Sequence, residues 1–172
     1  MNTHSEESRI LRNVYGKFAT GVSVVSFLDK DNKPFGLTVN SFTSVSLDPP
    51  IALWCVDKKS DLCESLINED NYVFNFLADD QTDLAVKLAE KNNHNLNDIN
   101  CDIQEYGPII KHSLGWVACS KREVIESGDH FIIFGNVYST TLCFHDSNVN
   151  SGSSICNCLV AVANSDSAVI VS

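Results

Sequence analysis

The stretch from Gly36 to Pro50, GLTVNSFTSVSLDPP, decides how this chain folds. Within it, Ser41 to Ser46 alternates polar and apolar residues, which is the pattern of a strand with one buried face. Asp48-Pro49-Pro50 then stops the strand, because proline lacks a backbone N–H and restricts the residue before it. The apolar run from Ile51 to Val56 follows directly and predicts a buried strand.

β-rich sequence surrounds this stretch on both sides. Before it, Val22 to Phe27 and Phe35 to Val39 flank a polar turn and predict a hairpin. After it, Tyr72 to Leu77 predicts a further strand, and Gly115 to Ile125 with Phe131 to Leu142 predicts a long hairpin. Because these strands do not alternate regularly with helices, the pattern favours a mainly β or α+β barrel over a doubly wound sheet.

Three short helices are expected around this barrel. Ser60-Asp61 can cap the second helix, and the third runs from about Gln81 to Lys91. The asparagine-rich residues 92–100 predict an exposed loop. The first helix is expected to cover one end of the sheet with apolar residues that recur at helical spacing, namely Ile10, Leu11, Val14 and Phe18.

Length and charge limit the classes of protein to consider. A chain of 172 residues with 44% hydrophobic and 20% charged residues is typical of one compact globular domain. The net charge is −10 and no basic stripe occurs, so a nucleic-acid partner is not expected. No apolar run approaches the roughly 20 residues of a membrane span, and the polar start lacks a signal-peptide core. We therefore expect a cytoplasmic protein with no membrane partner.

Cysteine usage argues against both a disulfide framework and a metal centre. The chain has seven cysteines, an odd number, and no C-x-x-C pair. Most of them lie in apolar segments, as Cys55, Cys119 and Cys143 do, so reduced and buried thiols are expected. Cys156 and Cys158 have no matching second ligand pair, and we expect no metal site.

Two polar segments are candidates for chemistry, although the common nucleotide motifs G-x-G-x-x-G and the P-loop are absent. Hydroxyl and amide side chains between Gly36 and Pro50 could bind the carbonyls and ring nitrogens of a flat heterocycle. From composition alone, a polar edge strand with a turn explains them as well. His130, after Gly128-Asp129, could orient a ligand or exchange protons, or it could be a solvated turn histidine.

The combination of motifs resembles a known family. Thr20 to Val25, Thr38 to Pro50, and Gly128-Asp129-His130 followed by Gly135-Asn136-Val137 are similar, in order and spacing, to the flavin reductase family of FMN-binding split barrels. The likeness runs from about Leu11 to Cys143. It implies a split β-barrel domain over residues 1–146. Residues 147–172, which are rich in Ser, Asn and Val and contain no arginine, depart from the family pattern and form an atypical C-terminal segment.

The resemblance also implies an activity. Members of this family are homodimers that bind FMN or FAD and oxidise NADH or NADPH, often delivering reduced flavin to a separate monooxygenase. Two alternatives stay open: a flavin-binding carrier or electron-transfer protein without useful turnover, and a split-barrel oxidase acting on a small substrate. Because no arginine cluster is present to bind a 2′-phosphate, NADH is favoured slightly over NADPH.

Residue roles follow from the same resemblance. His130 is expected to position the nicotinamide, with Gly128 and Asp129 shaping its turn. Ser60 corresponds to the family's phosphate contact, a role that a helix N-terminus would favour, and Lys91 could add a positive charge. The flavin ring and ribityl chain would be held by Thr38, Val39, Asn40 and Ser41, with Ser46 and Asp57 near the same pocket.

Overall fold

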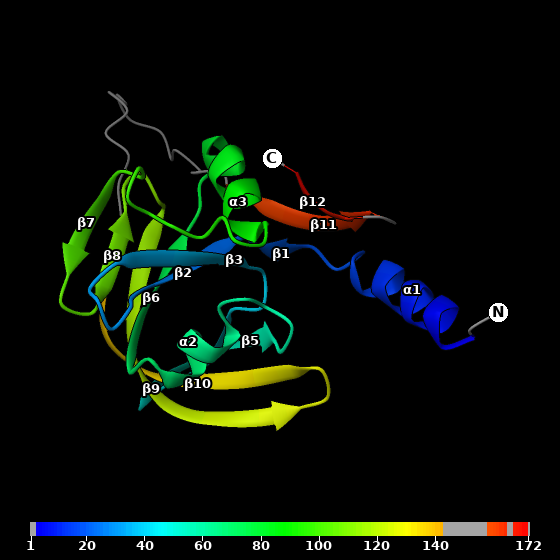
Figure 1. Ribbon diagram of the computed structural model, residues 1–172, viewed down its shortest axis with the longest axis horizontal. Helices are drawn as coiled ribbons and strands as arrows, with labels where there is room; N and C mark the ends of the chain where they lie inside the picture. Colours follow the sequence, from blue (N-terminus) through cyan, green and yellow to red (C-terminus); the bar gives the residue numbers. More distant parts are fainter. Residues whose placement is uncertain (1–2, 143–157, 165–166, 172) are drawn as a thin grey trace.

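A seven-stranded antiparallel sheet forms the centre of the molecule in the computed structural model, which describes residues 3–142, 158–164 and 167–171 (Figure 1). The strand order is β3-β2-β6-β9-β10-β5-β4, and every neighbouring pair is antiparallel. This order confirms the predicted mainly β class. The strands are β2 (Ser23–Leu28), β3 (Pro34–Val39), β4 (Thr43–Leu47), β5 (Pro50–Asp57), β6 (Asn71–Phe76), β9 (Gly115–Ser127) and β10 (His130–Leu142).

The sheet curls until its two ends share one core. Phe27 of β2 and Val39 of β3 belong to the same buried cluster as Trp54 of β5, although these strands lie far apart in the strand order. Phe42, in the connection between β3 and β4, lies edge-on to Phe74 of β6 with 4.8 Å between the ring centroids. Contacts across the curled sheet enclose a buried core between its two ends, as in a barrel. The split-barrel expectation is therefore confirmed.

Two helices close parts of this barrel. α2 (Cys63–Asn68) inserts Cys63 and Leu66 into the main core, and α3 (Thr82–Ala89) follows a short 3-10 turn, η1 (Asp79–Gln81). The α3 helix packs with β2 and β3 through a second core cluster. The predicted cap of α2 is wrong, because the position before the helix is Leu62 and no side chain caps it. Ser60 instead accepts the Leu62 N–H in the preceding turn, at 3.3 Å.

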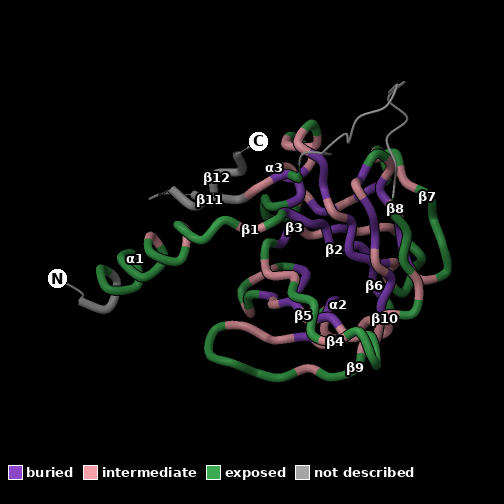
Figure 2. Tube along the Cα trace, turned by 180° about the vertical axis from the view of Figure 1, so that it is seen from behind, coloured by how far each residue is buried: buried purple, intermediate pink, exposed green. Residues whose placement is uncertain are grey.

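The first helix, α1 (Thr3–Tyr15), stands away from the barrel (Figures 1 and 2). The expectation that it covers one end of the sheet is wrong. Its apolar stripe packs against few of the residues that the structure describes and is exposed on the single chain. The exposed fractions are 56% for Ile10, 49% for Leu11, 61% for Val14 and 68% for Tyr15, with 77% for Phe18 beyond the helix end.

A short hairpin of β7 (Cys101–Gln104) and β8 (Gly107–Ile110) follows the asparagine-rich loop, and the sequence patterns did not predict it. Buried polar side chains of the main sheet hold it in place. Ser26 Oγ donates to the Pro108 carbonyl at 2.5 Å, and Asn75 Oδ1 accepts the Ile110 N–H at 2.8 Å. These contacts bridge residues that are distant in sequence, which explains why local periodicity does not reveal them.

The described part of the C-terminal segment forms β11 (Val160–Asn164) and β12 (Ser167–Val171), which continue a small sheet begun by β1 (Thr20–Gly21). Leu159 is fully buried, accepts the Val22 N–H and donates to the Leu77 carbonyl. The end of the chain is therefore joined to the β2 edge of the barrel. The remaining residues of the predicted 147–172 segment, with Cys143 and Cys156, lie outside the described residues.

No helix of the described ranges is long and apolar enough to cross a membrane. Within the same ranges, no group of three or more His, Cys, Asp or Glu side chains could hold a metal ion.

Cys119 lies at the centre of the core beside Tyr72 and Trp54, with no exposed surface. Burial raises the pKa of the Cys119 thiol to about 12. Burial, followed by the nearby Cys119, also raises the pKa of Tyr72. In an unfolded chain a cysteine thiol ionises near pH 8.5. The native protein therefore keeps the Cys119 proton over a pH range in which the unfolded chain has lost it.

This difference predicts alkaline destabilisation. Above about pH 8.5 the native state binds more protons than the unfolded state, so the free energy of unfolding falls as pH rises, by about 1.4 kcal/mol per pH unit for this thiol. Urea unfolding of Cys119→Ala between about pH 9 and pH 10.5 should show a slope that is shallower by this amount. The control is Cys158→Ala, whose thiol is exposed and should leave the slope unchanged. Equal slopes for Cys119→Ala and the parent protein would contradict the argument.

Candidate active site

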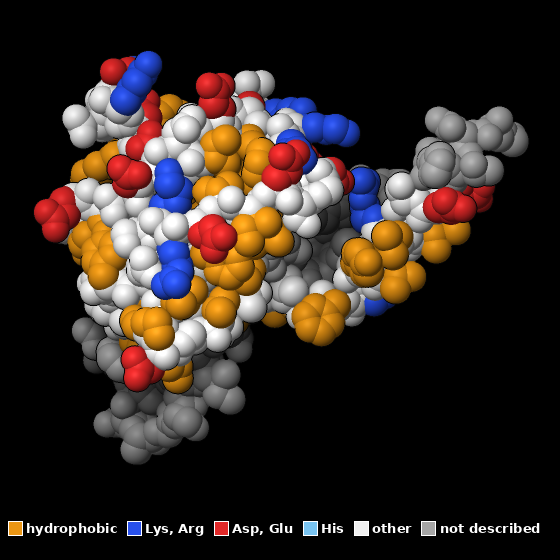
Figure 3. Space-filling view, turned by 90° about the horizontal axis from the view of Figure 1, so that it is seen from below, with side chains coloured by type: hydrophobic (Ala, Val, Ile, Leu, Met, Phe, Trp, Pro, Cys, Tyr) orange, Lys and Arg blue, Asp and Glu red, His pale blue; other side chains and the backbone are white. Residues whose placement is uncertain are grey.

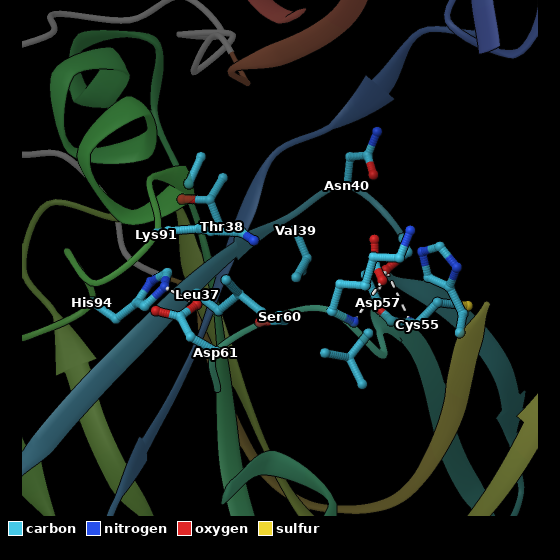
Figure 4. A pocket seen from close by; sticks show the side chains of 15 residues that line it. Leu37, Thr38, Val39, Asn40, Cys55, Asp57, Ser60, Asp61, Lys91 and His94 are labelled. Atoms are coloured by element: carbon cyan, nitrogen blue, oxygen red, sulfur yellow. Dashed lines mark hydrogen bonds and ion pairs between the residues drawn. The ribbon is translucent and has the colours of Figure 1, made fainter. Parts of the chain in front are cut away.

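A cleft of about 400 Å³ opens between the end of β3, the end of β5, the turn that follows β5, and the C-terminal end of α3 (Figure 4). Its volume falls in the range of small-molecule sites. One wall comes from β3 and its continuation, another from β5, and the far end from residues after α3. The lining residues are Leu37, Thr38, Val39, Asn40, Ser41, Cys55, Val56, Asp57, Lys59, Ser60, Asp61, Ala89, Lys91, His94 and His130.

Hydroxyl groups fix the β3 wall of the cleft to its neighbours. Thr38 Oγ1 donates to the Ala85 carbonyl of α3 at 2.7 Å. Ser41 Oγ donates to the Cys55 carbonyl at 3.1 Å and accepts the Cys55 N–H at 3.0 Å. The first contact ties β3 to α3, and the other two tie the end of this wall to β5. Asn40 lies between the two tied positions, exposed and with its amide directed away from them (Figure 4).

His130 lies at the opposite wall, where β10 begins. The β5–β10 register pairs it with Asp57, and its ring Nδ1 is 2.7 Å from Asp129 Oδ1. The hydrogen bond from His130 and its charge hold the pKa of the Asp129 carboxyl below its usual value. An ionised carboxylate only accepts hydrogen bonds, so Nδ1 carries a proton and the ring is oriented by Asp129. His130 Nε2 has no partner within the described part of the chain and is available to a ligand.

Lys58 holds the turn that carries His130. Its Nζ donates to Glu126 Oε1 at 2.6 Å and to the Gly128 carbonyl at 2.5 Å, and its backbone N–H donates to the Asp129 carbonyl. Gly128 has a φ of 60°, a conformation that favours glycine over other residues. These contacts connect the hairpin turn to the end of β5. The position of the His130 backbone is thereby fixed relative to the cleft.

The far end of the cleft carries positive and hydroxyl groups. The Ser60 hydroxyl accepts one backbone N–H, which leaves its own proton free to donate to a ligand. Lys91 makes no ion pair or hydrogen bond through its ammonium group with any residue that the structure describes. An unpaired ammonium beside a hydroxyl donor suits an anionic group.

Asp61 and His94 form an ion pair at this same end. Asp61 Oδ1 lies 2.9 Å from His94 Nε2, and Asp61 Oδ2 accepts the Asn92 N–H at 2.6 Å. Burial by itself raises the pKa of the Asp61 carboxyl, but these hydrogen bonds and the charge of His94 outweigh it, so the pKa lies below its usual value. The His94 ring is 4% exposed. Neither residue was predicted as part of the site. The sequence indicated Asp61 only as a helix cap, and His94 lies in a loop with no periodicity.

The structure brings together most of the residues predicted for the site. Ser46 lies on β4 and is not among the residues that line the cleft, and the Asp129 side chain reaches the cleft only through His130. The predicted residues that do line it are Thr38, Val39, Asn40, Ser41, Asp57, Ser60, Lys91 and His130. The lining residues that sequence reasoning missed are Leu37, Cys55, Val56, Lys59, Asp61, Ala89 and His94.

The cleft fits an elongated ligand with two different ends. Apolar side chains and the exposed Asn40 amide lie along its length. His130 lies at one end, and Lys91, Ser60 and the Asp61–His94 pair lie at the other (Figure 4). A flavin has this distribution: a flat ring with polar edges, a ribityl chain and an anionic phosphate. The donor set of the cleft is therefore suited to a flavin phosphate.

Comparison with known proteins gives the family. A family model for the flavin reductase like domain matches residues 15–153, and the chain belongs to this family. The solved structure of the NADH:FAD oxidoreductase SgcE6 of Streptomyces globisporus C-1027, in complex with NAD and FAD fragments, superposes with a TM-score of 0.75. It is 31% identical and the match covers 80% of this chain and 84% of that one.

Two curated relatives come from Rhizobium meliloti (strain 1021). A probable flavin reductase is 39% identical over 145 residues, which is 84% of this chain and 45% of the relative. The stachydrine N-demethylase reductase subunit Stc3 is 36% identical over 132 residues, which is 76% of this chain and 57% of the relative. The chain thus spans about half the length of these two relatives.

Proposed function

We propose that this protein is an NAD(P)H-dependent flavin reductase, which transfers hydride from a nicotinamide to FMN or FAD. The observation that carries the proposal is the cleft with an oriented imidazole at one end and an unpaired ammonium beside a hydroxyl at the other. The family membership and the activity named for SgcE6 support it. We also propose that the protein is located in the cytoplasm.

Each end of the cleft has a distinct task in this proposal. Ser60 and Lys91 bind the flavin phosphate, and Asn40 with the backbone around it binds the polar edge of the ring. The isoalloxazine ring supplies the hydride acceptor when it is bound, so the protein needs no strong base. Its contribution is to align the two ligands, because hydride transfer requires the reacting atoms to approach within about 3–3.5 Å.

His130 aligns the nicotinamide. Its Nδ1 proton is committed to Asp129, so the orientation of the ring is set before a ligand arrives. His130 lines the cleft, and its Nε2 can form a hydrogen bond to the carboxamide of a nicotinamide. The exposed position of the pair allows the nicotinamide to enter and leave without opening the barrel.

A turnover assay tests the proposed activity. Purified protein with NADH or NADPH and free FMN or FAD should consume the nicotinamide continuously, which is measured by the loss of its absorbance. Comparing the two nicotinamides and the two flavins also decides which of each is preferred. Tightly retained flavin without turnover would instead favour the carrier hypothesis, and no flavin binding at all would refute the proposal.

Substitution of His130 tests the assignment of the nicotinamide end. His130→Ala should raise the nicotinamide KM or slow flavin reduction by about tenfold to a hundredfold, because misaligned reactants lose effective molarity. Flavin affinity, measured by fluorescence quenching, should be nearly unchanged. The control is His112→Ala, because His112 does not line the cleft. An unchanged steady-state profile for His130→Ala would remove His130 from the mechanism.

We also propose that the protein forms a homodimer and delivers reduced flavin to a separate monooxygenase. The reductase subunit Stc3 among its relatives supports the second part. The first part is supported by α1, whose apolar side chains gather on an arm that projects from the barrel (Figure 3). Exposed apolar surface of this kind is typical of an interface with another chain.

Charge placed on the α1 stripe should disrupt the dimer. Val14→Asp introduces a carboxylate among the exposed apolar side chains and should shift the protein toward monomer in light scattering after size exclusion, because burying that charge is costly. Asn13→Asp is the matched control, since it introduces the same group outside the stripe on the next residue. Dimerisation of Val14→Asp equal to that of Asn13→Asp would show that the stripe is not the interface.

A further inference from the structure

Two separate loops meet at the phosphate end of the cleft, and one carboxylate joins them. Asp61 belongs to the turn after β5, next to Ser60, whereas Asn92 and His94 belong to the loop that follows α3. We propose that Asp61 and His94 form a clamp that positions Lys91 and Ser60 for the phosphate joined to the ribityl chain of a flavin. The inference rests on the proposed function, because it assigns the phosphate to this end of the cleft.

The Asp61 carboxylate uses both oxygens for this purpose. Oδ2 accepts the Asn92 N–H at 2.6 Å, and Oδ1 lies 2.9 Å from His94 Nε2. One carboxylate therefore holds two positions of the loop after α3. Asn92 has a φ of 61°, a left-handed conformation that an asparagine tolerates and that needs support from its surroundings. The bond to Asp61 provides that support directly after Lys91. The backbone that carries the ammonium is thereby fixed.

The hydrogen-bond partners of His94 define its protonation state. Nδ1 lies 3.2 Å from the Leu88 carbonyl, which can only accept, and Nε2 faces the Asp61 carboxylate, which also only accepts when ionised. Both ring nitrogens therefore carry protons, and the ring is an imidazolium. Since His94 is buried, its charge needs the opposite charge of Asp61 beside it.

This pairing explains how a carboxylate can line the wall of an anion site. An unpaired Asp61 would repel a phosphate, but the imidazolium cancels its charge locally. The ammonium groups of Lys91 and Lys59, which both line the cleft, make no ion pair with any residue that the structure describes, and Lys91 supplies the attraction beside the clamp. The clamp therefore acts by fixing the position of Lys91 and Ser60. Its loss should weaken only the binding of the phosphate.

Comparison of FMN with riboflavin isolates this effect, because the two differ only in the phosphate. Asp61→Ala removes both hydrogen bonds, and its dissociation constant for FMN should rise roughly tenfold, the size of a lost pre-organised contact, while that for riboflavin stays within about twofold. Both constants are measured by quenching of flavin fluorescence. Unchanged riboflavin binding also shows that the variant is folded.

Asp61→Asn is the matched control that separates position from charge. Its amide oxygen can accept the Asn92 N–H, and its amide nitrogen can donate to Nε2 of a neutral His94 that still donates from Nδ1 to Leu88. The pair is then uncharged overall, as in the parent protein, and the clamp is kept. FMN affinity of Asp61→Asn should therefore stay within about threefold of the parent.

A double-mutant cycle with Lys91→Met tests whether the clamp acts through the ammonium. Lys91→Met should weaken FMN but not riboflavin, and adding Asp61→Ala to it should weaken FMN by less than about twofold more, because the positioned group is already gone. Additive losses in the double variant would overturn the inference. So would tighter FMN binding by both Asp61 variants, which would mark Asp61 as a repulsive wall, or equal losses for FMN and riboflavin. If the parent protein binds none of riboflavin, FMN and FAD, the proposed function itself fails.

Discussion

The antiparallel pairing of β5 with β10 is the interaction on which both the barrel and the cleft depend. Its register runs from His130 opposite Asp57 to Asn136 opposite Ile51. It joins one end of the curled sheet to the long β9–β10 hairpin and seals Trp54 and Ile133 inside. The same register places His130 at the mouth of the cleft, so one set of backbone hydrogen bonds serves both stability and function.

The walls of the site come from β3 and β5, and short connections supply most of its charged groups. The turn after β5 supplies Lys59, Ser60 and Asp61, the loop after α3 supplies Lys91 and His94, and the hairpin turn at residues 128–129 leads directly into His130. Such connections would be mobile if they were held only at their ends. Here each is tied by named contacts: Ser41 to Cys55, Lys58 to the turn before His130, and Asp61 to the loop that carries Lys91. These contacts fix the connections that complete the cleft.

Charge distribution explains how an acidic protein can accept an anionic ligand. The chain carries a net charge of −10, and carboxylates line the cleft itself. Asp129 and Asp61 are each bonded to a histidine, and Asp57 accepts the backbone N–H of Lys59 at 2.8 Å. Both oxygens of Asp61, at the phosphate end, have partners, as does one oxygen of Asp57, and Asp129 lies outside the cleft lining. The Lys91 ammonium can then act at short range, where local charges outweigh the net charge of a distant surface.

The sequence by itself determined the β-rich class and the hairpins of the main sheet, because alternation and turn residues are local signals. Its resemblance to a family, carried by motifs such as Thr38 to Pro50, indicated about half of the residues that line the cleft. Only the tertiary structure decided that Asp61 meets His94, that Ser46 lies off the cleft, and that α1 stands free of the sheet. The physical reason is that these contacts join residues far apart in the sequence. The hydrogen bond between Asp61 and His94 connects two loops that have no periodic pattern. The apolar stripe of a helix shows that its surface needs a partner, but it does not specify which partner.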